Sequence, residues 1–322
     1  MGLWSRLGEF GFSGFSSSPT AEQVTEGIDG SHLTAIVTGT TSGIGRETVR
    51  VLAKRGVTVV MTARSMERGE QVKESLLKDN PTAKLHLMEM DLSSINSVIS
   101  FARAFYQSNL PLNILVNNAG VFGCPFELSV DGVELMFATN YLGPFLLTNL
   151  LLDKLKATVK ETGMEGRIVN VSSLAHRFAL SSTMELEKLN DPSNYQRYDA
   201  YVRTKLANLL HAYELTKRFK EEGCNVTINS LHPGVIPTNI SRNNNLFDSI
   251  VMFLMRPIFK NVAQGASPIC YIALHPKLNG ISGKYFTTDC KEIAPSKYAT
   301  DEHLSKRLWN FSQELIGIIK KP

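Results

Sequence analysis

The chain has 322 residues, of which 43% are hydrophobic and 20% are charged, as in an ordinary globular protein. Its formal net charge of +4 comes without a dense basic stripe, which argues against a nucleic-acid partner. No uninterrupted apolar run reaches the length of a membrane-spanning helix, and the length suits one large α/β domain or two small ones.

Residues 1–33 are predicted to form an N-terminal arm ahead of the folded domain. The segment from Gly8 to Ser18 is rich in Gly, Phe and Ser and poor in acids, as a transit peptide is. It is short, however, and it contains Glu9. A targeting signal and a flexible arm therefore both stay open as readings of this segment.

A glycine-rich turn follows the first predicted strand. Residues 34–38 are apolar and β-branched, as in a buried parallel strand, and residues 46–55 have helical composition. Between them lie Gly39, Gly43 and Gly45. Backbone N–H groups and a helix N-terminus both favour an anion, so we predict a pyrophosphate cradle here. A glycine turn without a phosphate role is the alternative.

Strand-like and helix-like segments then alternate along the chain. Further strands are expected at 57–62, 85–90, 112–116, 167–171 and 226–231, and helices at 68–78, 95–106, 133–159 and 198–222. This pattern predicts one α/β domain with a Rossmann-type, doubly wound parallel sheet. Ligands bind beyond the carboxyl ends of such strands. Residues expected at those ends, and hence around one cleft, are Gly39, Asp91, Asn117, Ser173 and Pro233.

Charge at the end of the second strand indicates which dinucleotide binds. An acid there would bind a ribose 2′-hydroxyl and repel a 2′-phosphate, but this strand runs into Arg64 without an acid. The planar guanidinium suits phosphate, and Arg46 could assist. We therefore expect NADP(H) rather than NAD(H), with a solvated Arg64 as the alternative. Asp91 is expected to accept a hydrogen bond from the adenine amino group.

A proton-transfer pair is expected on the helix at 198–222. Tyr201 and Lys205 are four residues apart and would share one helix face. A free tyrosine has a pKa near ~10 and is a poor proton donor or acceptor at neutral pH. A fixed cation nearby is expected to lower that pKa toward the working range.

Several motifs together resemble the short-chain dehydrogenase/reductase family from about Thr34 to about Lys291. They are Thr38-Gly39-x-x-x-Gly43-x-Gly45, Asn117-Asn118-Ala119-Gly120, Asn140, Ser173 with Tyr201 and Lys205, and His232-Pro233-Gly234. The surroundings of Asn140 and His176 resemble the retinol-dehydrogenase-like branch. Stretches near Gly11, Ile28 and Leu150 resemble plant short-chain dehydrogenases associated with the protein translocon of the inner chloroplast envelope. That resemblance implies a chloroplast location on the stromal side of the inner envelope, with the cytoplasm as the alternative.

The resemblance also implies roles for individual residues. Tyr201 would donate or accept the proton, and Ser173 would hold the carbonyl oxygen. Lys205 would bind the nicotinamide ribose, and Asn140 would support a proton-relaying water. The cofactor-binding positions that it implies are Gly39, Thr41, Ser42, Gly43, Ile44, Gly45, Arg64, Asp91, Leu92, Asn118, Ala119, Gly120, Tyr201, Lys205, Pro233, Val235 and Thr238.

Three other polar residues in these motifs are expected to be structural. The family pattern places the catalytic serine immediately before Leu174-Ala175, which leaves Ser172 without a catalytic role. His176 and His232 invite an acid–base interpretation, but anchoring of loops is favoured. The four cysteines, Cys124, Cys224, Cys270 and Cys290, lack metal-ligand spacing, so free thiols and no metal site are expected.

The substrate is expected to be a small lipophilic carbonyl or alcohol. Residues 239–261, within a dehydrogenase domain at 34–291, are strongly apolar and are predicted to form a substrate lid. An apolar lid suits a bulky lipophilic ligand or peripheral contact with a membrane. A lid helix packed on the body of the domain is the alternative.

Residues 292–322 are predicted to form a C-terminal amphipathic helix. An apolar stripe at helical spacing, with Trp309 and four basic residues, is typical of calmodulin targets, and the resemblance points the same way. Plain packing of this helix onto the fold is the favoured alternative. The family commonly pairs through the helices that carry Asn140 and Tyr201, so monomer and homodimer both stay open. A redox-sensing accessory of the translocon is the alternative to an active NADP(H)-dependent enzyme.

Overall fold

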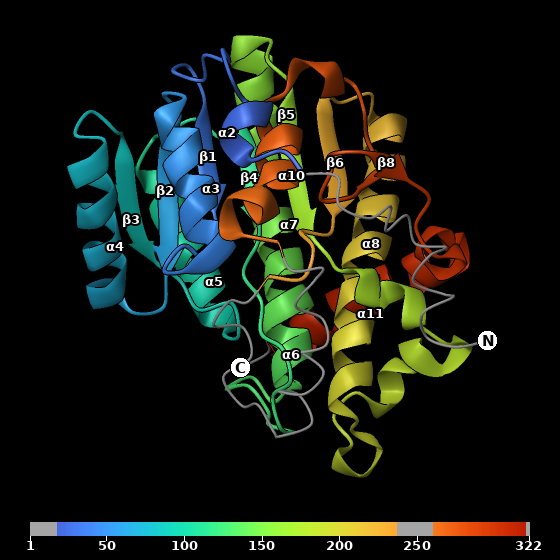
Figure 1. Ribbon diagram of the computed structural model, residues 1–322. Helices are drawn as coiled ribbons and strands as arrows, with labels where there is room; N and C mark the ends of the chain where they lie inside the picture. The colour runs from blue at the N-terminus through green and yellow to red at the C-terminus, as the bar shows by residue number, and fades with distance from the viewer. Residues whose placement is uncertain (1–17, 237–259, 320–322) are drawn as a thin grey trace.

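The computed structural model describes residues 18–236 and 260–319 (Figure 1). Its centre is an eight-stranded sheet in the order β3-β2-β1-β4-β5-β6-β7-β8. The strands are β1 (Thr34–Val37), β2 (Thr58–Ala63), β3 (Leu85–Glu89), β4 (Ile114–Asn117), β5 (Gly166–Val171), β6 (Val226–Leu231), β7 (Tyr285–Phe286) and β8 (Glu292–Ile293). Strands β1 to β7 pair in parallel, and β8 is antiparallel to β7. The predicted single-domain, Rossmann-type fold is confirmed.

Helices cover both faces of this sheet. They are α2 (Ala21–Val24), α3 (Gly43–Lys54), α4 (Met66–Asp79), α5 (Ile95–Gln107), α6 (Leu135–Phe137), α7 (Gly143–Thr162), α8 (Arg197–Glu222), α10 (Val262–Leu274) and α11 (Glu302–Ile319). Helices α3, α4 and α10 contribute to one apolar core, and α5, α7 and α8 contribute to the other. Helix α11 packs against α8 on the outer side of that second layer (Figure 1).

The edge of the sheet beyond β6 departs from the sequence prediction. Strands β7 and β8 are two residues long each, too short to show a periodicity. Tyr285 pairs with Ile293 across them, so the predicted domain boundary at residue 291 separates two paired strands. Helix α10 was also not predicted, because its apolar residues follow the apolar segment that was assigned to the lid.

The long helix predicted at 133–159 contains an irregular turn. Leu135–Thr162 is helical, but Ala138–Leu142 forms a π-helical turn that contains Asn140. A side chain at Gly143 would come within 2.2 Å of the Leu92 carbonyl oxygen, so this helix passes very close to the end of β3. The helix is long and apolar enough to cross a membrane, but 78% of its apolar window is buried within the protein, as in a core helix.

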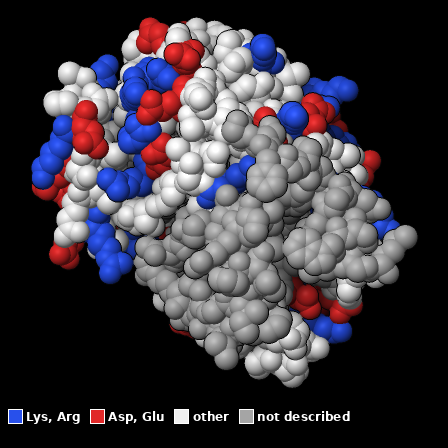
Figure 2. All heavy atoms as spheres, viewed as in Figure 1, with Lys and Arg blue, Asp and Glu red and all other residues white. Residues whose placement is uncertain are grey.

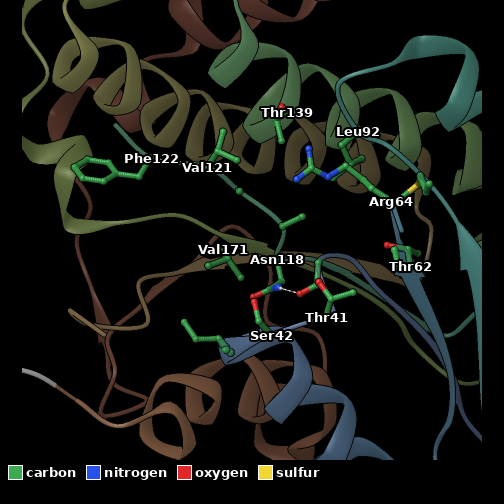
Figure 3. Close-up of a pocket in the computed structure, with 18 of the residues that line it drawn as sticks. Thr41, Ser42, Thr62, Arg64, Leu92, Asn118, Val121, Phe122, Thr139 and Val171 are labelled. Atoms are coloured by element: carbon green, nitrogen blue, oxygen red, sulfur yellow. Dashed lines mark hydrogen bonds between the residues drawn. The ribbon is translucent and has the colours of Figure 1, made fainter. Parts of the chain in front are cut away.

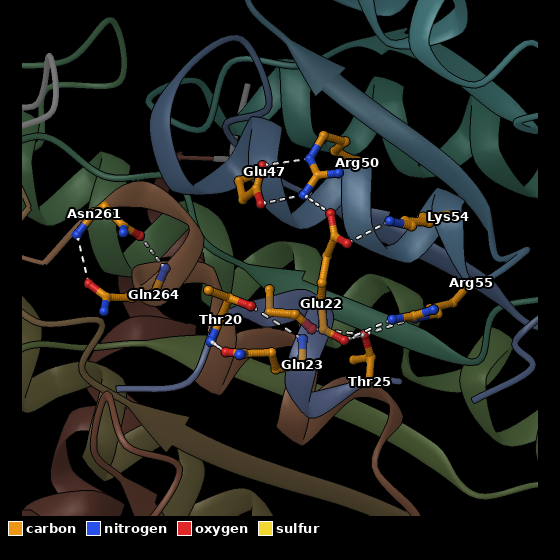
Figure 4. A network of polar contacts seen from close by, with 11 residues as sticks. Thr20, Glu22, Gln23, Thr25, Glu47, Arg50, Lys54, Arg55, Asn261 and Gln264 are labelled. Carbon is orange, nitrogen blue, oxygen red and sulfur yellow. Dashed lines mark hydrogen bonds and ion pairs between the residues drawn. The ribbon is translucent and has the colours of Figure 1, made fainter. Parts of the chain in front are cut away.

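The described part of the predicted N-terminal arm packs onto the fold (Figure 4). Ala21 of α2 is fully buried in a small cluster with residues of α3 and α10. Glu22 pairs with Arg50 at 2.6 Å and with Lys54 at 2.5 Å, and Arg55 donates to the Glu22 carbonyl at 2.7 Å. Residues from Ser18 onward are therefore an integral part of the α3–α10 layer.

Most of the predicted lid, residues 239–259, lies outside the described residues, as does Thr238. The described residues on either side of this segment are joined to each other, because the Lys260 backbone N–H donates to the Val235 carbonyl at 3.0 Å. Asn261 then caps α10 by accepting from the Gln264 backbone N–H at 2.8 Å. On the face seen in Figure 2, acidic and basic side chains are interspersed over the described surface.

Candidate active site

The strand ends converge on a cavity of about 460 Å³. Figure 3 shows Arg64 at one end of its lining and Phe122 at the other. Predicted site residues in the wall are Gly39, Thr41, Ser42, Gly43, Ile44, Gly45, Arg64, Asp91, Leu92, Asn118, Ala119, Gly120, Tyr201, Lys205 and Pro233. Asn140 and Ser173 are not among the wall residues, but their neighbours Thr139 and Ser172 are. Val235 is described but does not belong to the wall, and Thr238 lies outside the described residues.

The glycine turn forms a cradle at the N-terminus of α3. Gly39 has a φ of +71°, and a side chain at Gly45 would come within 2.2 Å of the Gly39 carbonyl oxygen. Asn118 braces this turn, since its amide donates to the Thr38 carbonyl at 2.7 Å. The backbone therefore approaches the cavity closely, as binding of a pyrophosphate requires. These residues fit a dinucleotide.

The ribose end of the cavity carries the predicted charge. Arg64 follows β2 and its guanidinium points into the cavity beside Leu92 (Figure 3). The Asp91 carboxylate also lines the wall and accepts from the Ser93 N–H at 2.9 Å and hydroxyl at 2.7 Å. Arg46 is not among the wall residues, and its guanidinium donates to Ser75 of α4 at 3.0 Å.

The proton-transfer pair lies where α8 passes the end of β5. Burial raises the pKa of Tyr201 to about 12, although the neighbouring Ser173 side chain favours the phenolate and lowers that pKa. Lys205 Nζ lies 5.4 Å from the Tyr201 ring centroid and donates to the Val171 carbonyl at 3.0 Å. Burial lowers the pKa of Lys205 to about 8. Desolvation therefore dominates the pKa of Tyr201 in this structure, and the expected lowering by Lys205 stays a prediction.

Asn140 braces the loop after β4 from the π-helical turn. Its Oδ1 accepts from the Val121 N–H at 2.7 Å, and its Nδ2 donates to the Val121 carbonyl at 2.9 Å. The same Nδ2 lies 3.2 Å from Thr204 Oγ1 on α8. Asn140 thus ties α8 to the wall residues that follow Asn117. π-Helical turns occur frequently at functional sites.

Contacts of the three other polar residues agree with the structural roles that were expected. Ser172 Oγ donates to the Lys205 carbonyl at 2.8 Å, which holds α8 against β5. Burial lowers the pKa of His176 to about 4 and that of His232 to about 3, so both rings are neutral at physiological pH. His232 Nδ1 is hydrogen-bonded to the Tyr285 hydroxyl at 3.1 Å.

The sequence prediction missed the apolar end of the cavity. The Phe122 ring meets the Tyr201 ring edge-on, with centroids 4.7 Å apart, and lies 5.8 Å from the Tyr198 ring. Cys124 lines the same region, and its carbonyl accepts from the Tyr195 hydroxyl at 2.7 Å. Phe122 and Cys124 lie two and four residues after Gly120 in the loop that follows β4, and this closeness is the signal that could have found them.

Known proteins with similar sequences decide the family. A family model described as short chain dehydrogenase matches residues 33–184. Over 309 residues, 96% of each chain, the protein is 50% identical to short-chain dehydrogenase TIC 32 B, chloroplastic, of Brassica napus. The chain belongs to the short-chain dehydrogenase family. Like its relatives, this short-chain dehydrogenase is an oxidoreductase of a family that uses nicotinamide cofactors.

Two further similarities extend over most of this short-chain dehydrogenase. It is 40% identical over 283 residues to retinol dehydrogenase 12 of Mus musculus, which covers 88% of this chain and 86% of that one. A crystal structure of an uncharacterised protein from Mycobacterium paratuberculosis superimposes with a TM-score of 0.71 at 29% identity. That match covers 91% of this chain and 97% of the other.

Proposed function

We propose that this short-chain dehydrogenase interconverts a lipophilic carbonyl and its alcohol with NADP(H), using Tyr201 as proton donor and acceptor. The observation that carries the proposal is that Tyr201, beside the Ser173 side chain, lines one cavity together with Lys205 and the glycine cradle. A phenol, a hydroxyl and an amine are the groups that carbonyl reduction needs around one oxygen.

Each residue has a separate task in this proposal. The nicotinamide, when bound, supplies or takes up the hydride. In the direction of reduction, negative charge builds up on the carbonyl oxygen, and Tyr201 delivers a proton to it. Ser173 stabilises the same oxygen with its hydroxyl. Lys205, next to the Tyr201 ring, supports the charge that the phenol leaves behind and binds the ribose. Asn140 would support a water that returns a proton to Lys205.

Cofactor preference follows from the ribose end of the cavity. Arg64 contributes a guanidinium to the wall at the end of β2, where an acid would repel a 2′-phosphate. Arginine binds phosphate through parallel hydrogen bonds. This charge supports NADP(H) as the cofactor.

The lipophilic substrate is supported by the opposite end of the cavity. Phe122 and Val121 line it, and the Tyr198 ring lies next to that of Phe122. Apolar and aromatic walls gain free energy by covering apolar ligand surface.

Turnover of a panel of aldehydes and ketones with NADPH, and of the alcohols with NADP⁺, tests the proposal. Tyr201→Phe is expected to lower kcat by about 10²- to 10⁴-fold, because it removes the proton donor, while NADPH still binds. Tyr213→Phe, elsewhere on α8, is the matched control. A wild-type protein that turns over no carbonyl, or a Tyr201→Phe variant with full activity, would overturn the proposal.

A redox-sensing accessory of the inner-envelope translocon is the second candidate function. The 50% identity to a protein named TIC 32 B, chloroplastic, supports it and supports a chloroplast location, which we place at the stromal side of the inner envelope. The translocon partners would then read the NADP(H) state. If the accessory role alone operates, Tyr201→Phe leaves NADP(H)-dependent binding to envelope components unchanged, whereas Gly45→Val, which fills the cradle, abolishes it.

A further inference from the structure

His176 holds the catalytic turn through both nitrogens of its ring. It lies in a short 3-10 helix, Leu174–Phe178, and its side chain is completely buried. Its Nδ1 is 2.6 Å from the Ser173 carbonyl oxygen, and its Nε2 is 3.1 Å from the Ser296 backbone nitrogen. A carbonyl only accepts and a backbone N–H only donates. The ring is therefore neutral, with its proton on Nδ1 and its lone pair on Nε2.

This turn holds both the backbone carbonyl and the side-chain hydroxyl of Ser173. Its carbonyl also accepts from the His176 backbone N–H at 3.2 Å. Its Oγ accepts from the Ala175 N–H at 3.2 Å and lies beside the Tyr201 side chain. The position of the Ser173 hydroxyl thus depends on a turn whose carbonyl side is held by the His176 ring.

The other side of the His176 ring is fixed by a distant segment. Ser296 precedes the 3-10 helix Lys297–Thr300, shortly after β8. Arg177 donates to the Ala294 carbonyl and ties the same two segments together. The His176 ring also meets Tyr285 of β7 edge-on, with centroids 4.9 Å apart. The ring therefore fills the space between the catalytic turn and the β7–β8 edge.

We propose that His176 is a positioning residue for Ser173: the Nδ1–H of its neutral ring holds the Ser173 carbonyl and so sets where the catalytic hydroxyl lies. The inference rests on the proposed function of Ser173 and goes beyond it. The ring itself takes no part in proton transfer, because both of its nitrogens are engaged by backbone groups. A histidine that only fills the core would contribute stability without setting the geometry of Ser173.

Two amide substitutions separate the two hydrogen bonds of the ring. In His176→Asn, the side-chain amide nitrogen takes the place of Nδ1 and still donates to the Ser173 carbonyl. In His176→Gln, the amide oxygen takes the place of Nε2 and still accepts from Ser296. We expect His176→Asn to keep kcat within about 3-fold and His176→Gln to lower it by about 10-fold or more. The Kd for NADPH is expected to be unchanged in both variants.

A double-mutant cycle separates positioning from packing. If His176 acts through Ser173, His176→Gln lowers kcat in the wild type but costs nothing further in Ser173→Ala. Additive losses, or equal losses in the Asn and Gln variants that follow their melting temperatures, would show that His176 only fills the core.

A readout without turnover keeps the inference separate from the proposed function. Crystal structures of the two variants are expected to show Ser173 in its place beside Tyr201 in His176→Asn and displaced in His176→Gln. If the wild type turns over no carbonyl, the proposed function fails while these structures still decide the positioning role. An unmoved Ser173 in His176→Gln would overturn it.

Discussion

Lys205 and Tyr201 lie one helical turn apart on α8, with Lys205 Nζ 5.4 Å from the centre of the Tyr201 ring. Only 3% of the Lys205 surface is exposed, and its Nζ donates to the Val171 carbonyl. Because burial lowers the pKa of this amine to about 8, its charge changes near the pH of many assays. The charge beside the proposed proton donor is therefore sensitive to pH.

This burial predicts how stability depends on pH. Between about pH 8 and the ordinary lysine pKa of 10.5, the unfolded chain holds a proton on Lys205 that the folded chain has lost. Stability rises with pH wherever the unfolded state binds more protons. We therefore expect the free energy of unfolding of the wild type to rise, relative to that of Lys205→Met, between about pH 8 and pH 10.5. Urea titrations of both proteins at each pH would measure this difference. A flat or falling difference would contradict the depressed pKa.

The guanidinium of Arg64 is expected to decide between the two nicotinamide dinucleotides. In Arg64→Asp the new carboxylate would repel a 2′-phosphate and accept from a 2′-hydroxyl. The ratio of kcat/KM for NADPH over NADH should fall by about 10²-fold or more, since a charge-assisted pair is replaced by repulsion. Arg103→Asp, an exposed position on α5, makes the same change in net charge and should leave the ratio unaltered. A wild type that prefers NADH would rule out the assignment.

Phe122 is expected to contribute to substrate affinity and to the orientation of Tyr201. Removing its ring in Phe122→Ala would leave the Tyr201 ring without its edge-on partner. Such aromatic pairs add about 0.5–1.5 kcal/mol beyond area burial. We expect kcat/KM for a bulky apolar carbonyl to fall by about 10-fold or more, and that for a small aldehyde to fall less. Val130→Ala, at a position that is 84% exposed, is the control.

The packing of helix α11 leads us to expect a monomer in solution. This helix covers the helices through which the family commonly pairs: the Trp309 ring meets Phe145 of α7 with centroids 4.9 Å apart, and Ser312 Oγ lies 2.9 Å from the Tyr141 hydroxyl. A light-scattering mass of one chain at micromolar concentration is the expected result. Trp309→Ala should cost about 3–5 kcal/mol of stability and favour self-association. A stable wild-type dimer would show that pairing uses another face.

The same packing bears on calmodulin binding by the C-terminal helix, which a peptide of residues 301–321 would test. The apolar stripe on α11 is turned inward, with Leu308 1% exposed and Trp309 5% exposed. Calcium-loaded calmodulin should therefore bind a peptide of these residues more tightly than it binds the intact protein. Isothermal titration of both would measure the difference. If neither binds, the calmodulin proposal is removed.

Local motifs allowed most of the cleft to be predicted. Glycines at Gly39 and Gly45 are required by the backbone itself, because a side chain at Gly45 would collide with the Gly39 carbonyl. Such a requirement is visible in one short stretch of sequence. Tyr201 and Lys205 are likewise placed together by helix geometry alone.

Features that depend on tertiary packing could not be predicted from the sequence. Arg46 follows the glycine turn as a phosphate-binding residue would, yet Ser75 of α4 takes its guanidinium. The raised pKa of Tyr201 depends on how deeply its phenol is buried, which no spacing shows. Strands β7 and β8 extend the sheet beyond β6, and this pairing is not visible in the local sequence.

The π-helical turn at Ala138–Leu142 makes this helix unusually intolerant of shortening. A π turn holds one residue more than an α turn, so deleting Thr139 could restore regular i→i−4 hydrogen bonding. The wide turn that directs the Asn140 amide at Val121 would then be lost, even though the flanking helical segments would stay roughly in register. The more regular helix would thus be incompatible with the loop that walls the cofactor cleft, and selection would act on the length of this segment as well as on its residues.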